Sequence, residues 1–155
     1  MRIALDTNIF AYAEGVQHGP ADTPKIATSR RLLEGLLQDL TFAAVAPTPA
    51  LAELYHVLTR KAGRSPEQAR AAVGGIIDMM EVAPATASVL RTALELAASH
   101  HLQIFDSVIV AASAAAGCEI LISEDLQDGS RPCAVTVSNP FGPNPHPVIG
   151  ALLRS

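Results

Sequence analysis

Four acidic residues that are far apart in the sequence occupy positions where their carboxylates could meet after folding. Asp6 follows the short apolar run Arg2–Leu5, and Asp125 lies two residues beyond Ser123, where another apolar run ends. Parallel sheets place polar sites just beyond the carboxyl ends of their strands, so these two acids are expected at one edge of a sheet. Asp106 begins a long apolar stretch, and Glu53 lies on a predicted helix, pointing away from its apolar face. We therefore expect four acids from four separate elements to converge.

A cluster of this kind has a specific chemical use. Mg²⁺ and Mn²⁺ prefer carboxylate and water oxygens, and they need few protein ligands when a phosphate supplies the rest. Such ions activate water and stabilise the charge that develops at the phosphorus of a phosphodiester. No Ser-His-Asp order and no glycine-rich phosphate loop competes for the role. The pattern thus indicates metal-dependent hydrolysis of a phosphate ester.

Each acid also has a purely structural interpretation. Asp6 could form a turn with its own backbone, and Asp106 could be a helix N-cap, a position that Asp favours. Glu53 could be a solvated residue on a helix face, and Asp125 and Asp128 could be ordinary turn acids. The functional interpretation is therefore joint: it depends on all four acids occurring in this order in one chain.

The elements that must position these acids alternate between strands and helices. This alternation, with short apolar strands, predicts the α/β class, a three-layer α/β/α fold with a mostly parallel central sheet. We expect one domain over residues 1–138 and a Pro-rich tail over residues 139–155, packed on or extending from it. Expected strands cover 2–5, 41–46, 81–83, 119–123 and 134–137; expected helices cover 9–12, 25–40, 49–62, 66–80, 86–100 and 106–116, with a short apolar segment at 148–153.

Several local features are expected as well. Thr48 and Ser65 are candidate N-caps, and Gly117 is a natural helix stop. Phe42 and Phe105 look like core residues, so a base-stacking platform is not expected. Two helix stripes are predicted to face the core; they are Leu51, Leu54, Tyr55 and Leu58 on one helix and Leu90, Leu94 and Ala97 on another.

Composition excludes several classes of protein. The 155 residues carry a net charge of −4, so a strongly basic nucleic-acid coat is excluded, although a local basic patch is not. Two cysteines exclude a disulfide scaffold and a Cys-rich zinc site. A membrane span needs about 20 mostly apolar residues, and no run approaches that length. We read no secretory or transit signal and expect a cytoplasmic protein without a membrane partner.

The motifs that carry the acids resemble those of PIN domains, and most closely those of the VapC-type toxins of VapBC toxin–antitoxin pairs. The matching segments occur in the family's order and extend over roughly Arg2 to Val137: Leu5-Asp6-Thr7-Asn8-Ile9-Phe10, Leu51-Ala52-Glu53-Leu54, Phe105-Asp106-Ser107-Val108-Ile109 and Ile122-Ser123-Glu124-Asp125-Leu126. The Pro-rich tail matches no motif of the family.

The resemblance implies an endoribonuclease that uses Mg²⁺ or Mn²⁺ to cleave single-stranded RNA. Its usual chemistry is attack by metal-activated water, leaving a 5′-phosphate and a 3′-hydroxyl. Carried over by position, Asp6 and Asp106 would be direct metal ligands, and Glu53 and Asp125 would complete the metal shell or hold waters. Glu124 and Asp128 are the alternatives to Asp125. Asn8 and Ser123 match positions that support the ligands.

Substrate and partners follow partly from charge and partly from the resemblance. RNA binding needs positive charge, and Arg60, Lys61 and Arg64 cluster after the predicted Glu53 helix. The same cluster could instead be a solvated helix face or a contact for an acidic partner. The resemblance further implies an antitoxin partner and a homodimer.

Two other functions fit parts of the pattern. The chain could be a PIN-fold adaptor that binds RNA or protein without catalysis, although all four acids are present. It could also be a phosphatase with an Asp nucleophile, because a strand that ends in Asp begins those enzymes too. They usually carry a second Asp two residues later, where this chain has Asn8.

Overall fold

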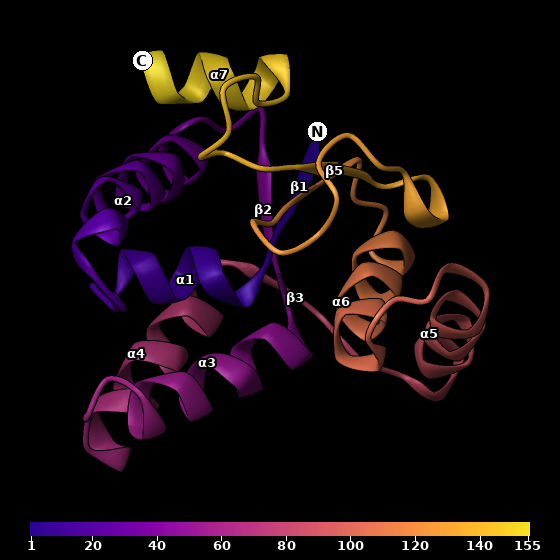
Figure 1. The fold of residues 1–155 in the computed structure, drawn as a ribbon, viewed down its shortest axis with the longest axis horizontal. Helices are drawn as coiled ribbons and strands as arrows, with labels where there is room; N and C mark the ends of the chain where they lie inside the picture. Colours follow the sequence, from indigo (N-terminus) through magenta and orange to yellow (C-terminus); the bar gives the residue numbers. More distant parts are fainter.

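The computed structural model describes all of residues 1–155 and has the predicted three-layer α/β/α architecture (Figure 1). A five-stranded sheet has the order β3-β2-β1-β4-β5, and every adjacent pair is parallel. The strands are β1 (Arg2–Leu5), β2 (Ala43–Pro47), β3 (Glu81–Ala83), β4 (Ile120–Ile122) and β5 (Thr136–Ser138).

Seven α-helices and two short 3-10 segments connect the strands. They are α1 (Thr7–Ala13), η1 (Pro20–Asp22), α2 (Thr23–Gln38), α3 (Thr48–Arg60), α4 (Pro66–Met79), α5 (Ala87–His100), α6 (Ile104–Ala115), η2 (Pro132–Ala134) and α7 (Pro147–Arg154). None of these helices combines the length and the apolar content needed to cross a membrane.

The two faces of the sheet bury different helices because successive strand residues point to opposite sides. Ile3 and Leu5 of β1 pack in a cluster with α1, α2, α3, α4 and α7. Ala4, between them, packs in a second cluster with α5 and α6. Figure 1 shows these two groups of helices on opposite sides of the sheet.

The tail after β5 covers part of the first layer. Ile149 and Leu152 of α7 are buried in the same cluster as Leu32 and Leu36 of α2. Gly35 allows this approach, since a Cβ there would lie 3.2 Å from Cδ2 of Leu152. The predicted apolar segment at 148–153 is therefore a packed helix.

Helix ends follow the expected chemistry in most places. Ser65 and Gln68 form a capping box at the start of α4, and Gly117 ends α6 with a positive φ of 72°. The prediction that Thr48 caps α3 is wrong: Pro47 is the N-cap, and Thr48 is already helical and donates to the carbonyl of Ala83 at 3.0 Å.

The predicted apolar stripe on α5 is displaced from the core, and the predicted stripe on α3 is buried except at Tyr55. On α5, Val89, Ala93 and Leu96 are buried, whereas Leu90 and Leu94 are exposed. The helix begins with Thr86 as its cap, and packing against α6 selects the neighbouring stripe. On α3 the predicted Leu positions are buried, but Tyr55 is exposed because it lies at the edge of that face.

Candidate active site

Asp6 lies at the point where the order of the strands in the sheet reverses. It follows β1, which pairs with β2 on one side and β4 on the other, the position at which open α/β sheets form a crevice. Asp6 is the N-cap of α1, and its carboxylate accepts from the backbone N–H of Thr7 at 2.7 Å. It also accepts from Oγ of the fully buried Ser123 at 2.7 Å. These bonds hold a buried acid in one orientation.

Asp125 is held beside it by the loop after β4. The Ser123 hydroxyl accepts from the backbone N–H of Asp125 at 3.2 Å, so a single side chain ties both acids together. Asn8 Nδ2 donates to Asp125 Oδ2 at 3.0 Å. Asn8 and Ser123, which the resemblance placed in support of the ligands, thus contact Asp125 and Asp6 respectively.

Glu53 reaches the same place from α3. Its Oε2 accepts from Oγ1 of Thr7 at 2.8 Å, a contact between residues 46 positions apart in the sequence. The buried residues Leu51, Leu54 and Leu58 anchor α3 in the core, which leaves Glu53 on the side that faces the crevice. Sequence reasoning did not identify Thr7, although a hydroxyl directly after a strand-end acid was a usable signal.

Asp106 is the third residue of α6, and Gln103 is the N-cap, so Asp106 is not the cap. Burial, followed by the charges of Asp125 and Glu53, raises the pKa of Asp106. A helix N-terminus by itself stabilises a carboxylate. The pKa of Asp106 is nevertheless raised, so burial and the nearby negative charges outweigh the effect of the helix N-terminus.

Burial also raises the pKa of Asp6 to about 6, and the charges of Asp106 and Asp125 add to the increase. The hydrogen bonds from Ser123 and Thr7 oppose it. A carboxylate that is buried among like charges lacks a positive partner, and a bound cation would supply one.

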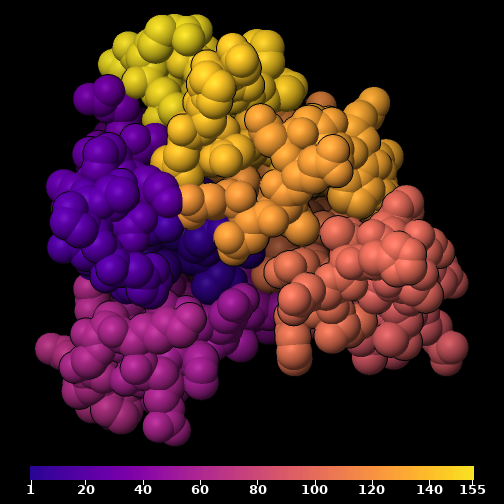
Figure 2. Space-filling model, in the orientation of Figure 1, coloured from indigo at the N-terminus to yellow at the C-terminus, as the bar shows by residue number.

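All four predicted acids line one cleft of about 220 Å³, together with Thr7 and Asn8. In Figure 2 the middle of the molecular face is hollowed, and the indigo N-terminal segment is visible beneath the magenta and orange segments. The structure therefore brings together the residues that the sequence analysis expected to converge.

The two alternatives to Asp125 are bound to other residues of the chain, although Glu124 also lines the acidic cleft. The Glu124 carboxylate forms an ion pair with Lys25 and accepts from the Tyr12 hydroxyl at 2.7 Å. Asp128 accepts from the backbone N–H of Asn139 at 2.9 Å, on the tail side of its loop. Of the three acids, only Asp125 is among those whose charge raises the pKa of Asp6.

Lys25 is a charged residue that the sequence analysis left without a role. Its Nζ lies 3.3 Å from Oδ1 of Asp22 and 3.3 Å from the Tyr12 hydroxyl, and 5.2 Å from the centre of the Tyr12 ring. The ion pair with Glu124 is the main cause that raises the pKa of Lys25. Lys25 thereby fixes Glu124 at the edge of the acidic cleft.

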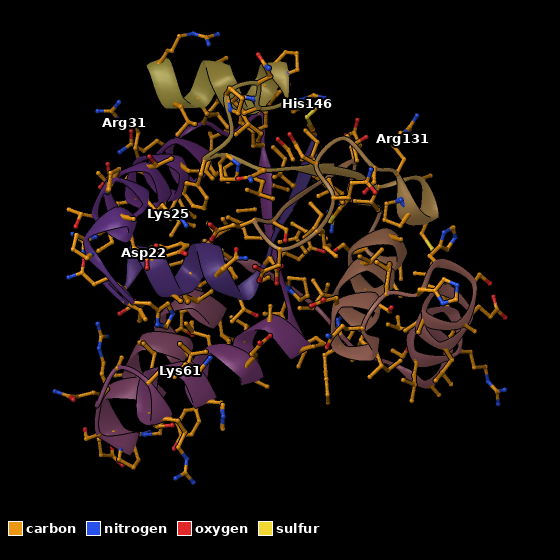
Figure 3. The ribbon with its side chains drawn as sticks, viewed as in Figure 1. Asp22, Lys25, Arg31, Lys61, Arg131 and His146 are labelled. Atoms are coloured by element: carbon orange, nitrogen blue, oxygen red, sulfur yellow. The ribbon has the colours of Figure 1, made fainter.

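The structure separates Lys61 from the other two basic residues proposed to contact RNA. Lys61 lines the acidic cleft, whereas Arg60 and Arg64 line a different hollow along α3. Arg64 is paired with Glu14, with Nη1 2.6 Å from Oε2. In the view of Figure 3, Lys25 and Lys61 lie on opposite sides of α1, so positive charge flanks the cleft from two directions.

The residues of the cleft fit a hard divalent cation. The donors are carboxylate, hydroxyl and amide oxygens, and Oδ1 of Asn8 is buried without a hydrogen-bond partner. No three acidic, His or Cys side chains lie close enough together to enclose an ion by themselves. Mg²⁺ usually takes one or two carboxylates and completes its shell with waters and phosphate oxygens, so an open cleft of this kind suits it.

Comparison with known proteins agrees with the geometry. The family model described as PIN domain matches residues 3–127. No curated protein matches the sequence significantly.

Solved structures give the same result for the fold. VapBC2 from Rickettsia felis, bound to a DNA fragment of its promoter, aligns with a TM-score of 0.63 and 19% identity over 90% of this chain and 98% of that one. VapC20 from Mycobacterium tuberculosis, a toxin that cleaves the sarcin-ricin loop, aligns with a TM-score of 0.60 and 20% identity over 77% and 86% of the two chains. VapBC-1 from nontypeable Haemophilus influenzae aligns with a TM-score of 0.64 and 17% identity over 90% and 98%.

Proposed function

Because this chain belongs to the PIN domain family, we propose that it is a divalent-metal-dependent endoribonuclease that cleaves single-stranded RNA, and that it acts as the toxin of a toxin–antitoxin pair. The observation that carries the proposal is the convergence of Asp6, Glu53, Asp106 and Asp125 on one cleft. The likeness in fold to VapC20, a toxin that cleaves an RNA loop, supports the choice of RNA.

The four acids would have different roles in binding the metal. Asp6 and Asp106, whose pKa values are both raised, would bind Mg²⁺ or Mn²⁺ directly, while Glu53 and Asp125 would complete the shell or hold waters. When bound, the cation supplies the charge that activates a water molecule and stabilises the transition state at phosphorus. Ser123 and Thr7 keep the carboxylates oriented through the hydrogen bonds that they donate.

Lys61 is the basic residue best placed to contact the substrate. It lies on the wall of the acidic cleft, and no carboxylate of the chain forms an ion pair with it. We assign to it a contact with an RNA phosphate that adjoins the cleaved bond. Arg60 would contact the backbone further along, whereas Arg64 is engaged by Glu14 and would contribute less.

Partners and location follow from this assignment. An antitoxin protein would silence the chain, and a homodimer would be its resting form; VapBC complexes are among the proteins of similar fold. A cytoplasmic location would give the nuclease access to RNA. Co-purification with the product of a neighbouring gene, sedimentation and cell fractionation test these three points.

The proposed activity is tested by incubating defined single-stranded RNAs with the pure chain, with Mn²⁺, Mg²⁺ or EDTA. We expect cleavage only with metal, giving 5′-phosphate and 3′-hydroxyl ends, and none from Asp106→Asn with an unchanged circular dichroism spectrum. Undiminished cleavage by Asp106→Asn would contradict its role. Metal-stimulated RNA binding without any cleavage would favour the non-catalytic adaptor instead.

A further inference from the structure

A second hollow, of about 530 Å³, adjoins the acidic cleft and has no role in the mechanism above. The two share a wall, because Glu53 and Asp106 line both. Figure 2 shows an open notch between magenta α3 and orange α6. The remaining lining residues come from one stripe of α3 and from the start of α6: Pro49, Ala52 and His56, and Gln103, Phe105 and Ile109.

Phe105 is the residue in this hollow that the fold does not explain. Its side chain is 73% exposed, although it was expected in the core. The core contacts at this end of α6 are made by Leu102 and Ile104, which pack with the second cluster, whereas Phe105 lies in the first turn of α6 on the wall of the hollow. One exposed apolar side chain is common on protein surfaces, but Phe105 lines a hollow beside the candidate active site, and such a hollow with an aromatic wall and a few polar groups is typical of a ligand site.

The polar groups of the hollow are also unused. At His56 and Gln103 the hydrogen bonds within the chain involve the backbone, with the carbonyls accepting from Thr59 and Ser107, and both side chains are left free. An imidazole and an amide each offer one donor and one acceptor to the edge of a flat heterocycle. RNA-binding proteins recognise unstacked bases with this combination of an aromatic face and polar edges.

We propose that this hollow binds one nucleobase of the RNA next to the cleaved phosphate, with Phe105 stacking on the base and Gln103 and His56 facing its edge. The inference rests on the proposed function and adds to it a site that selects sequence. Glu53 and Asp106, which would hold the cation, form the shared wall, so a base in the hollow lies beside the reacting bond. The basic residues that could bind phosphates do not line this hollow. Lys61 lies on the wall of the acidic cleft, and Arg60 and Arg64 line a different hollow.

A protein partner would require a different surface. A stable interface buries about 800 Å² on each partner, around an apolar centre. Here carboxylate, imidazole and amide groups surround a single exposed ring within a hollow of about 530 Å³. One nucleoside fills such a space and presents a flat face and polar edges to it, whereas a protein interface would need a larger apolar centre than this one ring.

The probe is a short single-stranded RNA that carries the fluorescent base 2-aminopurine at successive positions. We use the Asp6→Asn background, in which the RNA is bound but not cut. Stacking on Phe105 predicts quenching at one position only, and Phe105→Ala should abolish the quenching and weaken binding about tenfold. Leu94→Ala is the matched control, because Leu94 is also a large exposed side chain, 54% accessible, and lies on α5 away from the hollow.

A second measurement uses the otherwise unchanged enzyme and an RNA that lacks the base at the position found. Phe105→Ala should lower kcat/KM about tenfold on the complete RNA and have little effect on the abasic RNA, since the contact is already absent there. Equal losses on both RNAs, quenching that survives Phe105→Ala, or a change in sedimentation with normal RNA recognition would overturn the inference, the last in favour of a protein interface. If the wild type cleaves no RNA, the proposed function fails, and the quenching alone still decides whether the hollow binds a base.

Discussion

Replacing Asp6 by Asn should make the metal-free protein more stable at neutral and alkaline pH. Burial raises the pKa of Asp6 from its ordinary 3.8 to about 6, so ionising it in the folded protein costs about 3 kcal/mol. Asn has nearly the same shape and no charge. Its Oδ1 can still accept from Thr7, but its amide cannot accept from the Ser123 hydroxyl, whose oxygen already accepts from the backbone N–H of Asp125, and the lost hydrogen bond takes about 1 kcal/mol from the gain. The expected gain is therefore about 2 kcal/mol.

The sign of the pH dependence follows from the raised pKa. Between about pH 4 and pH 6 the folded protein binds more protons at Asp6 than the unfolded chain, so stability falls as pH rises through this range. Asp106, whose pKa is also raised, contributes in the same direction. The lowered pKa values of Asp22, bonded by the His18 N–H, and Asp39, bonded by Thr41, act only at lower pH.

The assay is urea unfolding in EDTA across this pH range, repeated with Mn²⁺. Wild type should lose stability with rising pH and regain it with metal, whereas Asp6→Asn should show a smaller pH dependence and little response to metal. Asp39→Asn is the control with the opposite sign, because the pKa of that exposed acid is lowered and its ionised form is stabilised. If Asp6→Asn is no more stable than wild type at about pH 8 in EDTA, the claim that ionised Asp6 destabilises the metal-free fold is refuted.

Three further changes test the surrounding structure. Lys25→Met removes the cation paired with Glu124 and should cost about 1 kcal/mol in urea unfolding; it should also raise Mn²⁺ affinity, because Glu124 lines the cleft and its charge is then no longer neutralised. Ser123→Ala removes a hydrogen bond that lowers the pKa of Asp6, so the acidic limb of the pH–rate profile should move to higher pH, and an unmoved limb would contradict the contact. Leu152→Ala should cost about 2–4 kcal/mol by opening a cavity between α7 and α2, and a loss below about 1 kcal/mol would show that the tail is not packed there.

The sequence predicted the fold because local signals agree with tertiary packing over most of the chain. Short apolar strands such as Ile120–Ile122, buried on both sides, and the cap at Ser65 each have a local cause that the tertiary structure does not oppose. The stripe on α5 was wrong because Val89, Ala93 and Leu96 form an equally apolar stripe on the same helix. The position of α6 decides which of the two stripes on α5 is buried, and the periodicity of the α5 sequence does not indicate where α6 lies.

The candidate site could likewise be predicted only in part. Three of the acids could be located because each follows a strand or begins a buried helix, and the order of strands brings those ends together. Glu53 could be located because it points away from the apolar face of its helix. The contact of Thr7 with Glu53 and the ion pair of Lys25 with Glu124 join residues 46 and 99 positions apart, and nothing local indicates them. Phe105 was assigned to the core because a Phe beside buried aliphatic residues normally lies there, whereas the first turn of α6 turns it outward.

The most direct test of the central claim is anomalous diffraction from crystals of the protein soaked in Mn²⁺. We expect an anomalous peak in the cleft, within coordination distance of carboxylate oxygens of Asp6 and Asp106, and its loss in Asp6→Asn crystals. A cleft that stays free of manganese while the ion binds elsewhere on the chain would contradict it.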